Sequence, residues 1–299
     1  MRIRQLQYFL IVADEQSFTR AAARAHIRQS PLSRAIKELE EELGVVLFER
    51  SKGRIRLTWP GKVFREDVRR LLAFLNSARA RAKAAEHGYR GHLRIALTDG
   101  LAQPRMAELL AMCRAEEPLT EVRVLEMTVS EMAHALKLDQ VDAGFTVHSG
   151  YGSENLVKEA VWTDRIVFAL PARHPLLIRD KLPLDEAIQY PMIICHPERC
   201  AGGFDILNRM FRDAGLAEPL VAEYVSGHEL MMTMVAAGYG IGLALDSQVA
   251  LYGHPNVVIR QIRDDVEEAS TFLVRAKRPS SPELERFVLR AKNIGSQIT

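Results

Sequence analysis

Short, closely spaced helices at the N-terminus are the strongest constraint that this sequence places on its own fold. Apolar residues recur at helical spacing from Leu6 to Ala13. Ser17 then occupies an N-cap position before a second predicted helix over residues 18–25. The sequence therefore starts with two helices that are separated by only a few residues.

A third predicted helix opens with polar and basic residues. We predict Ser30 as its N-cap and Pro31 as its first residue, where the missing N–H costs nothing. Apolar side chains follow at intervals of three or four residues, and Gly44 ends the helix. Two short helices in close succession, the second with such a start, are typical of a helix-turn-helix.

A basic hairpin is predicted directly after this helix. Residues 45–48 are apolar, residues 50–54 form a tight basic turn, and residues 55–58 alternate as a strand does. A hairpin with a basic tip beside a helix-turn-helix is a wing, which can place cations along a phosphate backbone.

One long helix is predicted over residues 61–87. Its apolar positions alternate in steps of four and three, which is the a/d pattern of a coiled coil. A seam this narrow favours a second helix as its partner, and packing against its own domain is the alternative. The predicted dimerisation residues are Phe64, Val68, Leu71, Leu75, Ala78 and Ala82.

Charge divides unevenly along the chain, although the whole sequence has a formal net charge of only +2. Residues 1–90 contain 19 Lys and Arg against 10 Asp and Glu, whereas residues 91–299 contain 21 against 28. The first segment is therefore +9 and the second −7. Such a division indicates a basic module for a polyanion joined to a module with another task. Nucleic acid is the first polyanion to consider and a membrane surface the second.

Strand-like and helix-like segments alternate over residues 92–299, which predicts parallel α/β sheets. About 210 residues is large for one such sheet, so we expect two subdomains around a cleft. The longest apolar runs, such as Ile241–Leu245, are too short to span a bilayer. The charged N-terminus is unlike a signal peptide, and three cysteines do not form a disulfide framework. We expect a cytoplasmic protein without membrane partners.

The sequence resembles the LysR-type transcriptional regulators over its whole length. The resemblance rests on Ser17-Phe18-Thr19-Arg20-Ala21-Ala22, Gln29-Ser30-Pro31-Leu32-Ser33, Leu47-Phe48-Glu49-Arg50, Leu57-Thr58, Gly61, Val141–Phe145, His174-Pro175-Leu176 and Val235–Gly242. It implies a winged helix-turn-helix, a dimerising linker helix and two α/β subdomains like those of periplasmic solute-binding proteins. It also implies a homotetramer, as in most members. The sequence departs from the family pattern at Arg28, where serine is frequent, and at Asp246, where proline is frequent.

This resemblance divides the chain into three parts. The expected parts are a winged helix-turn-helix DNA-binding domain over 1–58, a linker and dimerisation helix over 59–88, and an effector-binding domain over 89–299. Within the last part, subdomain I comprises 89–162 and 267–299, and subdomain II comprises 163–266. The expected function is sequence-specific transcriptional regulation under the control of a small molecule in the cleft between the subdomains.

The third helix and the wing supply the candidate DNA contacts. Gln29 can bind adenine and Arg34 guanine, each through two hydrogen bonds, and Ser30 and Ser33 can donate to bases or phosphates. A solvated helix face is the alternative for the cations of the second and third helices. Phosphate contacts are expected from Arg20, Arg28, Lys37, Arg50, Lys52 and Arg54, and Ser17, Thr19 and Pro31 complete the set. A dimer should bind an inverted repeat, a tetramer two such sites, and RNA polymerase is a further candidate partner.

Loops at the carboxyl ends of the predicted strands supply the candidate effector contacts. The family match points to Gly100, Val129 and Phe204, and the other candidates are Thr98, Asp99, Thr128, Ser130, His148, Gly203 and His228. Capping or turn formation is the alternative for each polar residue. An unpaired Asp99 carboxylate would disfavour a purely anionic ligand, unless it caps the following helix. The effector is expected to be a small organic metabolite.

Other chemistry is weakly indicated. Cys195, His196 and Cys200 lie close in sequence, but zinc would want four ligands and no second cluster accompanies them, so neither a metal nor a cofactor is predicted. Some relatives sense oxidants through paired thiols, so a redox-sensing regulator using Cys195 and Cys200 is one alternative. A solute-binding or enzymatic α/β protein with an incidental basic head is another. No catalytic constellation stands out, and we expect no enzyme activity.

Overall fold

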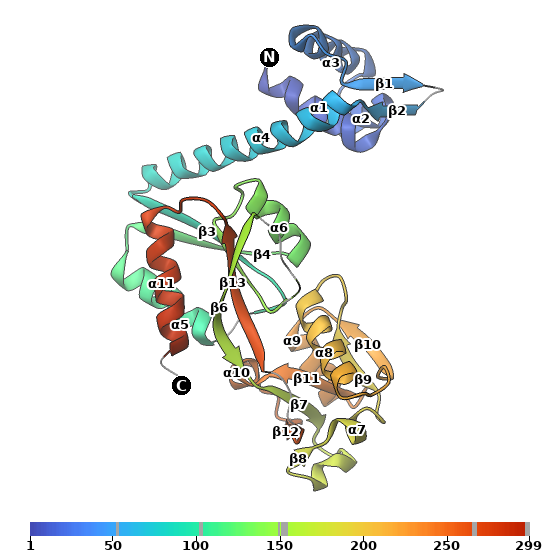
Figure 1. Ribbon diagram of the computed structural model, residues 1–299, viewed down its shortest axis with the longest axis vertical. Helices are drawn as coiled ribbons and strands as arrows, with labels where there is room; N and C mark the ends of the chain where they lie inside the picture. The colour runs from blue at the N-terminus through green and yellow to red at the C-terminus, as the bar shows by residue number, and fades with distance from the viewer. Residues whose placement is uncertain (52–53, 102–103, 149, 151–154, 265–267, 297–299) are drawn as a thin grey trace. The chain divides into compact units, whose positions relative to one another are not determined.

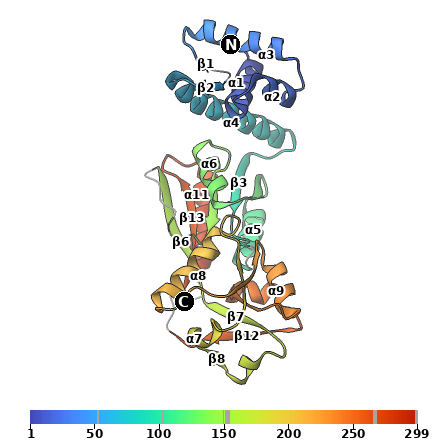
Figure 2. The ribbon, with the colours of Figure 1, turned by 90° about the vertical axis from the view of Figure 1, so that its right-hand side faces the viewer.

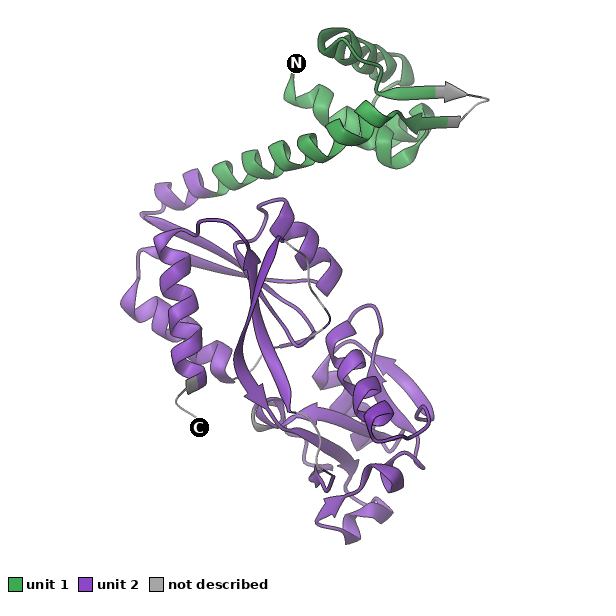
Figure 3. Ribbon diagram, viewed as in Figure 1, with its two compact units in different colours: residues 1–80 green, residues 81–299 purple. Residues whose placement is uncertain are grey.

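The chain divides into two compact units, residues 1–80 and residues 81–299 (Figure 3). A computed structural model describes residues 1–51, 54–101, 104–148, 150, 155–264 and 268–296. Within these ranges, no helix is long and apolar enough to cross a membrane.

A winged helix-turn-helix forms the first unit. Its elements are α1 (Ile3–Glu15), α2 (Phe18–Arg24), α3 (Gln29–Leu43), β1 (Phe48–Ser51), β2 (Arg54–Leu57) and α4 (Trp59–Glu86). The Ser17 hydroxyl caps α2 by accepting from the Arg20 amide at 3.4 Å, and Gly44 ends α3 with a φ of +69°. Both predicted helix boundaries are confirmed.

The predicted start of α3 is wrong by two residues. The helix begins at Gln29 with Arg28 as its N-cap, and not at Pro31 with Ser30 as its N-cap. Pro31 is tolerated because it still lies in the first turn, where backbone N–H groups have no partner within the helix.

Aromatic packing closes the core of this unit. The ring of Phe9 is fully buried and lies 5.4 Å from the ring of Phe48 and 5.2 Å from that of Phe64. Glu40 of α3 joins the helices to the wing, because its Oε1 accepts from the amides of Leu47 at 2.7 Å and Phe48 at 3.1 Å. The third helix and the wing are thus tied together by one carboxylate.

The wing passes into α4 through a close backbone contact. Thr58 caps α4 by accepting from the amide of Gly61 at 3.0 Å, and its own amide donates to the carbonyl of Leu47 at 3.0 Å. A Cβ on Gly61 would lie 2.2 Å from that carbonyl oxygen, closer than real Cβ atoms approach. Position 61 therefore requires glycine for space.

We predict that Gly61→Ala destabilises the first unit. The added methyl displaces the Leu47 carbonyl, and overpacking of this kind costs about 1–3 kcal/mol, more than the gain in helix propensity. Hydrogen–deuterium exchange of the α1–α3 amides in the full chain should accelerate. Gly253→Ala, where the new Cβ meets only ordinary contact at 3.6 Å, should leave exchange unchanged, and equal exchange in both variants would contradict the prediction.

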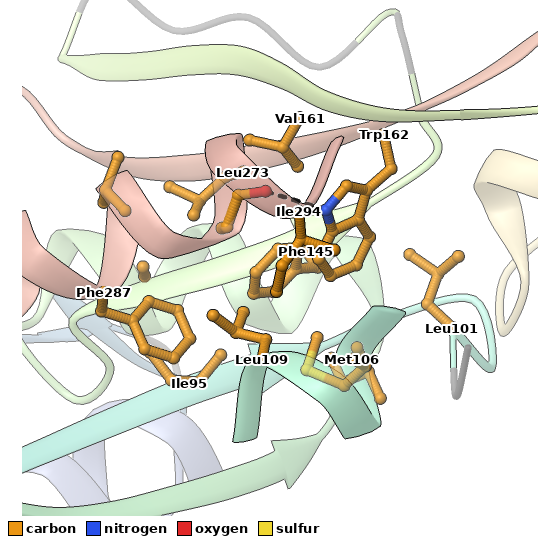
Figure 4. Packing of buried hydrophobic residues seen from close by; sticks show 14 of the residues in the cluster. Ile95, Leu101, Met106, Leu109, Phe145, Val161, Trp162, Leu273, Phe287 and Ile294 are labelled. Atoms are coloured by element: carbon orange, nitrogen blue, oxygen red, sulfur yellow. Dashed lines mark hydrogen bonds between the residues drawn. The ribbon is translucent and has the colours of Figure 1, made fainter. Parts of the chain in front are cut away.

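Five strands form the first sheet of the second unit. Their spatial order is β4 (Thr120–Glu126), β3 (Gly91–Leu97), β5 (Ala143–Thr146), β13 (Ala269–Ala276) and β6 (Leu156–Asp164). Helices α5 (Pro104–Glu116) and α11 (Pro282–Ser296) pack on one face, and α6 (Val129–Lys137) packs on the other (Figure 1). Trp162 stacks on Phe145 at 4.9 Å in the core and donates to the Ala291 carbonyl at 3.0 Å (Figure 4).

Six strands form the second sheet. Their order is β10 (Val221–Val225), β9 (Met192–Cys195), β11 (Ile241–Leu245), β7 (Ile166–Pro171), β12 (Val257–Ile262) and β8 (Lys181–Leu182). One face is covered by α8 (Ala201–Asp213), α7 (Leu184–Ala187) and the 3-10 helix Pro175–Ile178, and the other by α9 (His228–Ala236) (Figure 2). Helix α10 (Asp246–Leu251) follows β11.

Both sheets are mixed, and the expectation of parallel sheets is therefore wrong in part. Strand β13 runs antiparallel to β5 and β6, and β7 runs antiparallel to β11 and β12. The chain crosses between the sheets from β6 to β7 and returns from β12 to β13. At the first crossing, the buried Asp164 carboxylate accepts from Arg105 of α5 at 3.0 Å.

Candidate nucleic-acid interface and effector cleft

Helix α3 has one buried face and one exposed face. Leu32, Ile36 and Leu39 are fully buried in the core of the first unit. On the exposed face lie Arg28, Gln29, Ser30, Pro31, Arg34 and Lys37, with Ser33 half-buried at its edge. Six of the predicted DNA contacts thus share one accessible surface, which we call the α3 face.

The predicted phosphate contacts on the helices differ in their surroundings. Arg20 and Arg24 both form ion pairs with Glu15, and the Arg24–Glu15 distance is 3.0 Å. The Arg20 side chain is nevertheless 66% exposed. Lys37 pairs with Glu41 at 3.4 Å, whereas no ion pair involves Arg34 in the part of the chain that the structure describes. The Arg34 guanidinium therefore has no competing carboxylate within these ranges.

The wing candidates can be placed only in part. Lys52 lies outside the described residues, as do the side chains of Arg50 and Arg54. The backbones of Arg50 and Arg54 belong to β1 and β2, where Arg50 pairs with Ile55 across the hairpin. Thr19 is exposed on α2.

The predicted dimerisation seam is divided in the structure. Val68 is 2% exposed and packs in the core of the first unit, and Phe64 packs there against Phe9. Val68 follows the alternative, packing within its own domain, because a buried side chain cannot contact a partner. Phe64 is half-buried and keeps part of its ring exposed. Leu71 is 50% exposed, and two apolar residues that sequence reasoning missed, Trp59 and Val63, are 75% and 50% exposed. Leu75 and Ala78 are half-buried, and Ala82 is exposed.

A cleft lies where the carboxyl ends of β3 and β5 meet those of β9 and β11. It holds two neighbouring cavities of about 80 and 50 Å³, which we call the cleft cavities. Asp99, Cys195, Cys200 and Gln248 line both of them. Of the other predicted effector residues, Gly203 lines the larger and His228 the smaller.

Asp99 links the two sheets across this cleft. Its Oδ2 accepts from the hydroxyls of Thr98 at 2.7 Å and Thr146 at 3.0 Å, and its Oδ1 accepts from the Gly202 amide at 2.9 Å. Its backbone is left-handed, with a φ of +56°. Asp99 is therefore not unpaired, and the helix that it caps is α8 of the opposite sheet, not the following helix α5.

Two further contacts close the cleft. Gln248 donates to the carbonyl of Gly100 at 3.0 Å, and Nδ1 of His148 lies 2.7 Å from Oδ2 of Asp205. With the Asp99–Gly202 contact, these polar links join the subdomains around the cleft cavities. The structure thus shows a cleft that the chain's own groups hold closed.

Several predicted effector residues serve the fold locally. Thr98 is buried and also donates to the Phe145 carbonyl at 3.1 Å. Thr128 caps α6 in a capping box with Glu131, so the alternative of capping applies there. Ser130 contacts the Thr128 hydroxyl at 3.1 Å. Val129 is buried at the start of α6, and Phe204 packs against the core of the six-stranded sheet. None of these five side chains, nor His148, is among the described residues that line the cleft cavities.

The two cleft thiols are adjacent. Cys200 Sγ lies 3.2 Å from Cys195 Sγ and 3.8 Å from the Asp99 carbonyl oxygen, and both cysteines are free. The hydrogen bond to Cys195, together with burial, holds the pKa of the Cys200 thiol well above its ordinary value. A Cβ on Gly203 would lie 2.5 Å from Cys195 Sγ, so this pairing needs glycine there. In the described part of the chain, no three metal-ligating side chains come together.

Gln248 was missed by sequence reasoning because the short helix α10 that carries it was not predicted. Only its position just after a buried strand could have pointed to it. A third cavity, of about 400 Å³, lies along the later part of α8, where Arg209 and Asp213 line it. None of the predicted effector residues borders that cavity.

Together the two units define a class of protein, a DNA-binding regulator that joins a winged helix-turn-helix to a two-subdomain ligand-binding domain. The sequence profile "Bacterial regulatory helix-turn-helix protein, lysR family" matches residues 3–62, and "LysR substrate binding domain" matches residues 86–293. The chain therefore belongs to the LysR family of transcriptional regulators.

Relatives and solved structures agree with this assignment. The chain is 31% identical to the HTH-type transcriptional regulator ClcR of Pseudomonas putida over 256 residues, 86% of each protein. It is 32% identical to the HTH-type transcriptional regulator BenM of Acinetobacter baylyi over 247 residues, 81% of this chain and 80% of BenM. Full-length CbnR in complex with its target DNA is similar at a TM-score of 0.70 and 26% identity, over 98% of this chain and 100% of CbnR.

The predicted function is confirmed at the level of the family. The chain is a LysR-type DNA-binding transcriptional regulator with an effector-binding domain, and its relatives are named as regulators, not as enzymes. The alternative of an enzyme or solute-binding protein with an incidental basic head is therefore wrong.

Proposed function

We propose that the chain binds an inverted-repeat operator as a dimer and that a small organic effector in the cleft controls this binding. The α3 face carries the proposal, because five polar or basic candidates and Pro31 are exposed there above three fully buried apolar side chains. A helix presented in this way can enter the major groove, where base edges are distinguishable. Two symmetry-related copies of the face require two symmetry-related half-sites.

Gln29 and Arg34 are proposed to contact bases, and the remaining cations of the first unit to hold phosphates. Gln29 stands in the first turn of α3, and Arg34 follows it on the same exposed face. A bidentate contact contributes about 1–3 kcal/mol to discrimination between bases, whereas a phosphate contact adds affinity without sequence preference.

Arg34→Ala is predicted to weaken operator binding about 5- to 150-fold and random-sequence binding much less. A mobility-shift assay with DNA from upstream of the protein's own gene, and random DNA as competitor, measures both. Arg173→Ala, at an exposed arginine of the second unit, is the matched control. Equal losses on operator and random DNA at one salt concentration would contradict base contact by Arg34, and no preference of the unmodified chain for that fragment would contradict the proposed operator.

The outer face of α4 is proposed as the dimer contact. We also propose that dimers assemble into tetramers, and that the protein acts in the cytoplasm, where it can contact RNA polymerase. Exposed Trp59, Val63 and Leu71 lie along the helix at intervals of four and eight residues. An apolar stripe of this kind is typical of helix–helix association.

Leu71→Asp is predicted to raise the dissociation constant of the dimer at least tenfold, because it places a charge in an apolar contact. Sedimentation of the full chain measures the change. Leu289→Asp, at a leucine of α11 that is 58% exposed, is the control and should leave association unchanged. Equal association of both variants would place the dimer contact elsewhere.

Effector binding is proposed to act by changing closure of the cleft. Links from Asp99, Gln248 and His148 join the subdomains in this structure. A ligand that binds one degree of closure better than another shifts the population toward it, and the dimer or tetramer carries the shift to the DNA-binding domains.

Thiol-based sensing is a second candidate function, favoured by the 3.2 Å between Cys195 Sγ and Cys200 Sγ. Hydrogen peroxide would oxidise the two thiols to one disulfide and be reduced to two waters. The sulfurs need to approach by only about 1 Å to reach the bond length of a disulfide.

If the chain senses oxidants through these thiols, mild peroxide is predicted to have two effects. Neither Cys195 nor Cys200 should react with a thiol reagent afterwards, and the affinity for the operator should change. Cys195→Ser should abolish the effect, and Cys113→Ser, which removes a buried cysteine of α5, should retain it. Unchanged operator binding after oxidation would dismiss thiol sensing.

A further inference from the structure

Charge in the cleft cavities comes from one side chain. Asp99 is the single carboxylate among the described residues that line them, and no described lysine or arginine lines either one. Burial lowers the pKa of His228, which lines the smaller cavity, and so favours its uncharged ring. The cleft cavities therefore carry a negative charge without a compensating cation.

The chain's own carboxylates stand at the N-termini of α6, α8 and α9, where an anionic ligand would otherwise be favoured. Asp99 accepts from the Gly202 amide at the start of α8. Glu131 accepts from the Thr128 amide at the start of α6, at 2.8 Å. Glu229 stands in the first turn of α9. An anionic effector at these N-termini would thus meet charges of its own sign, and at α6 and α8 an amide that already donates to a carboxylate.

Asp99 retains room to accept one more hydrogen bond. A carboxylate oxygen has two lone pairs. Oδ2 uses both for the hydroxyls of Thr98 and Thr146, whereas Oδ1 accepts from Gly202 alone among the described residues. The rest of the lining is mainly apolar, with Ile193 and Leu243 in both cavities, and suits a hydrocarbon skeleton.

We propose that the effector is an amine whose ammonium group binds Oδ1 of Asp99 while its carbon skeleton lies against the apolar lining of the cleft cavities. This inference rests on the proposed function, since it names the ligand class of the same cleft. The ammonium supplies the missing countercharge, and charge-assisted hydrogen bonds are the strong ones. The amide of Gln248, which lines both cavities, is positioned beside the same ligand.

The size of the cleft cavities links binding to movement. They share Asp99, Ile193, Cys195, Leu243 and Gln248 in their lining, yet hold only about 80 and 50 Å³. A short alkylamine fits such a space, whereas a larger amine has to part the subdomains and break the Asp99–Gly202 link. The Asp99 carboxylate then loses its hydrogen bond from Gly202 and accepts one from the ligand instead. Ligand binding is in this way coupled to opening of the cleft.

Three probes with one carbon skeleton test the charge class: butylammonium, butyramide and butyrate. Ligand-observed NMR on the full chain at constant ionic strength gives their affinities. We expect butylammonium to bind at least tenfold more tightly than butyrate, with butyramide between them. This comparison uses the unmodified chain and depends on no variant.

Asp99→Asn tests the site, because asparagine tolerates the left-handed backbone, removes the charge and replaces one acceptor oxygen with an NH2 donor. We expect it to weaken butylammonium binding about tenfold, and Asp180→Asn, at an exposed aspartate outside the cleft cavities, to leave it unchanged. Tighter binding of butyrate, no binding of butylammonium, or equal binding by the two variants would overturn the proposal. Operator binding by Asp99→Asn, measured in parallel, separates these outcomes from failure of the DNA-binding function.

Discussion

The two chain crossings between the sheets determine most of what the second unit can do. Because the chain leaves the first sheet after β6 and returns through β13, strands of both sheets end on the same cleft. The buried Arg105–Asp164 pair fixes the first crossing, and breaking such a pair would leave a charge without its partner. The cleft, the contacts across it and the mixed topology of both sheets follow from this one pattern of connections.

Local sequence signals predicted what local chemistry determines. Ser17, Gly44 and the apolar spacing of residues 61–87 gave correct helices, since caps and periodicity act within a few residues. Strand β6 was not predicted, because polar Lys158 and Glu159 interrupt its apolar pattern. Antiparallel pairing of β13 was not predicted either, because it depends on partners more than a hundred residues away.

The candidate site was predictable by location but not by contact. Asp99 and His228 were chosen because they follow strands, and the structure places both at the cleft cavities. That Asp99 caps α8 depends on Gly202, which is 103 residues further along the chain. Likewise, a four-and-three spacing on α4 cannot say which positions face the core, and Val68 proved to be buried there. Long-range partners decide these roles, and no short window contains them.

Glu40 has a consequence for how signals reach DNA. Its carboxylate accepts from two successive wing amides while its backbone belongs to α3, so the recognition helix cannot rotate independently of the hairpin. Each DNA-binding domain is then expected to move as one rigid unit. In the proposed dimer, a regulated response therefore cannot come from a change within one DNA-binding domain and has to come from a change in the distance and the angle between the two.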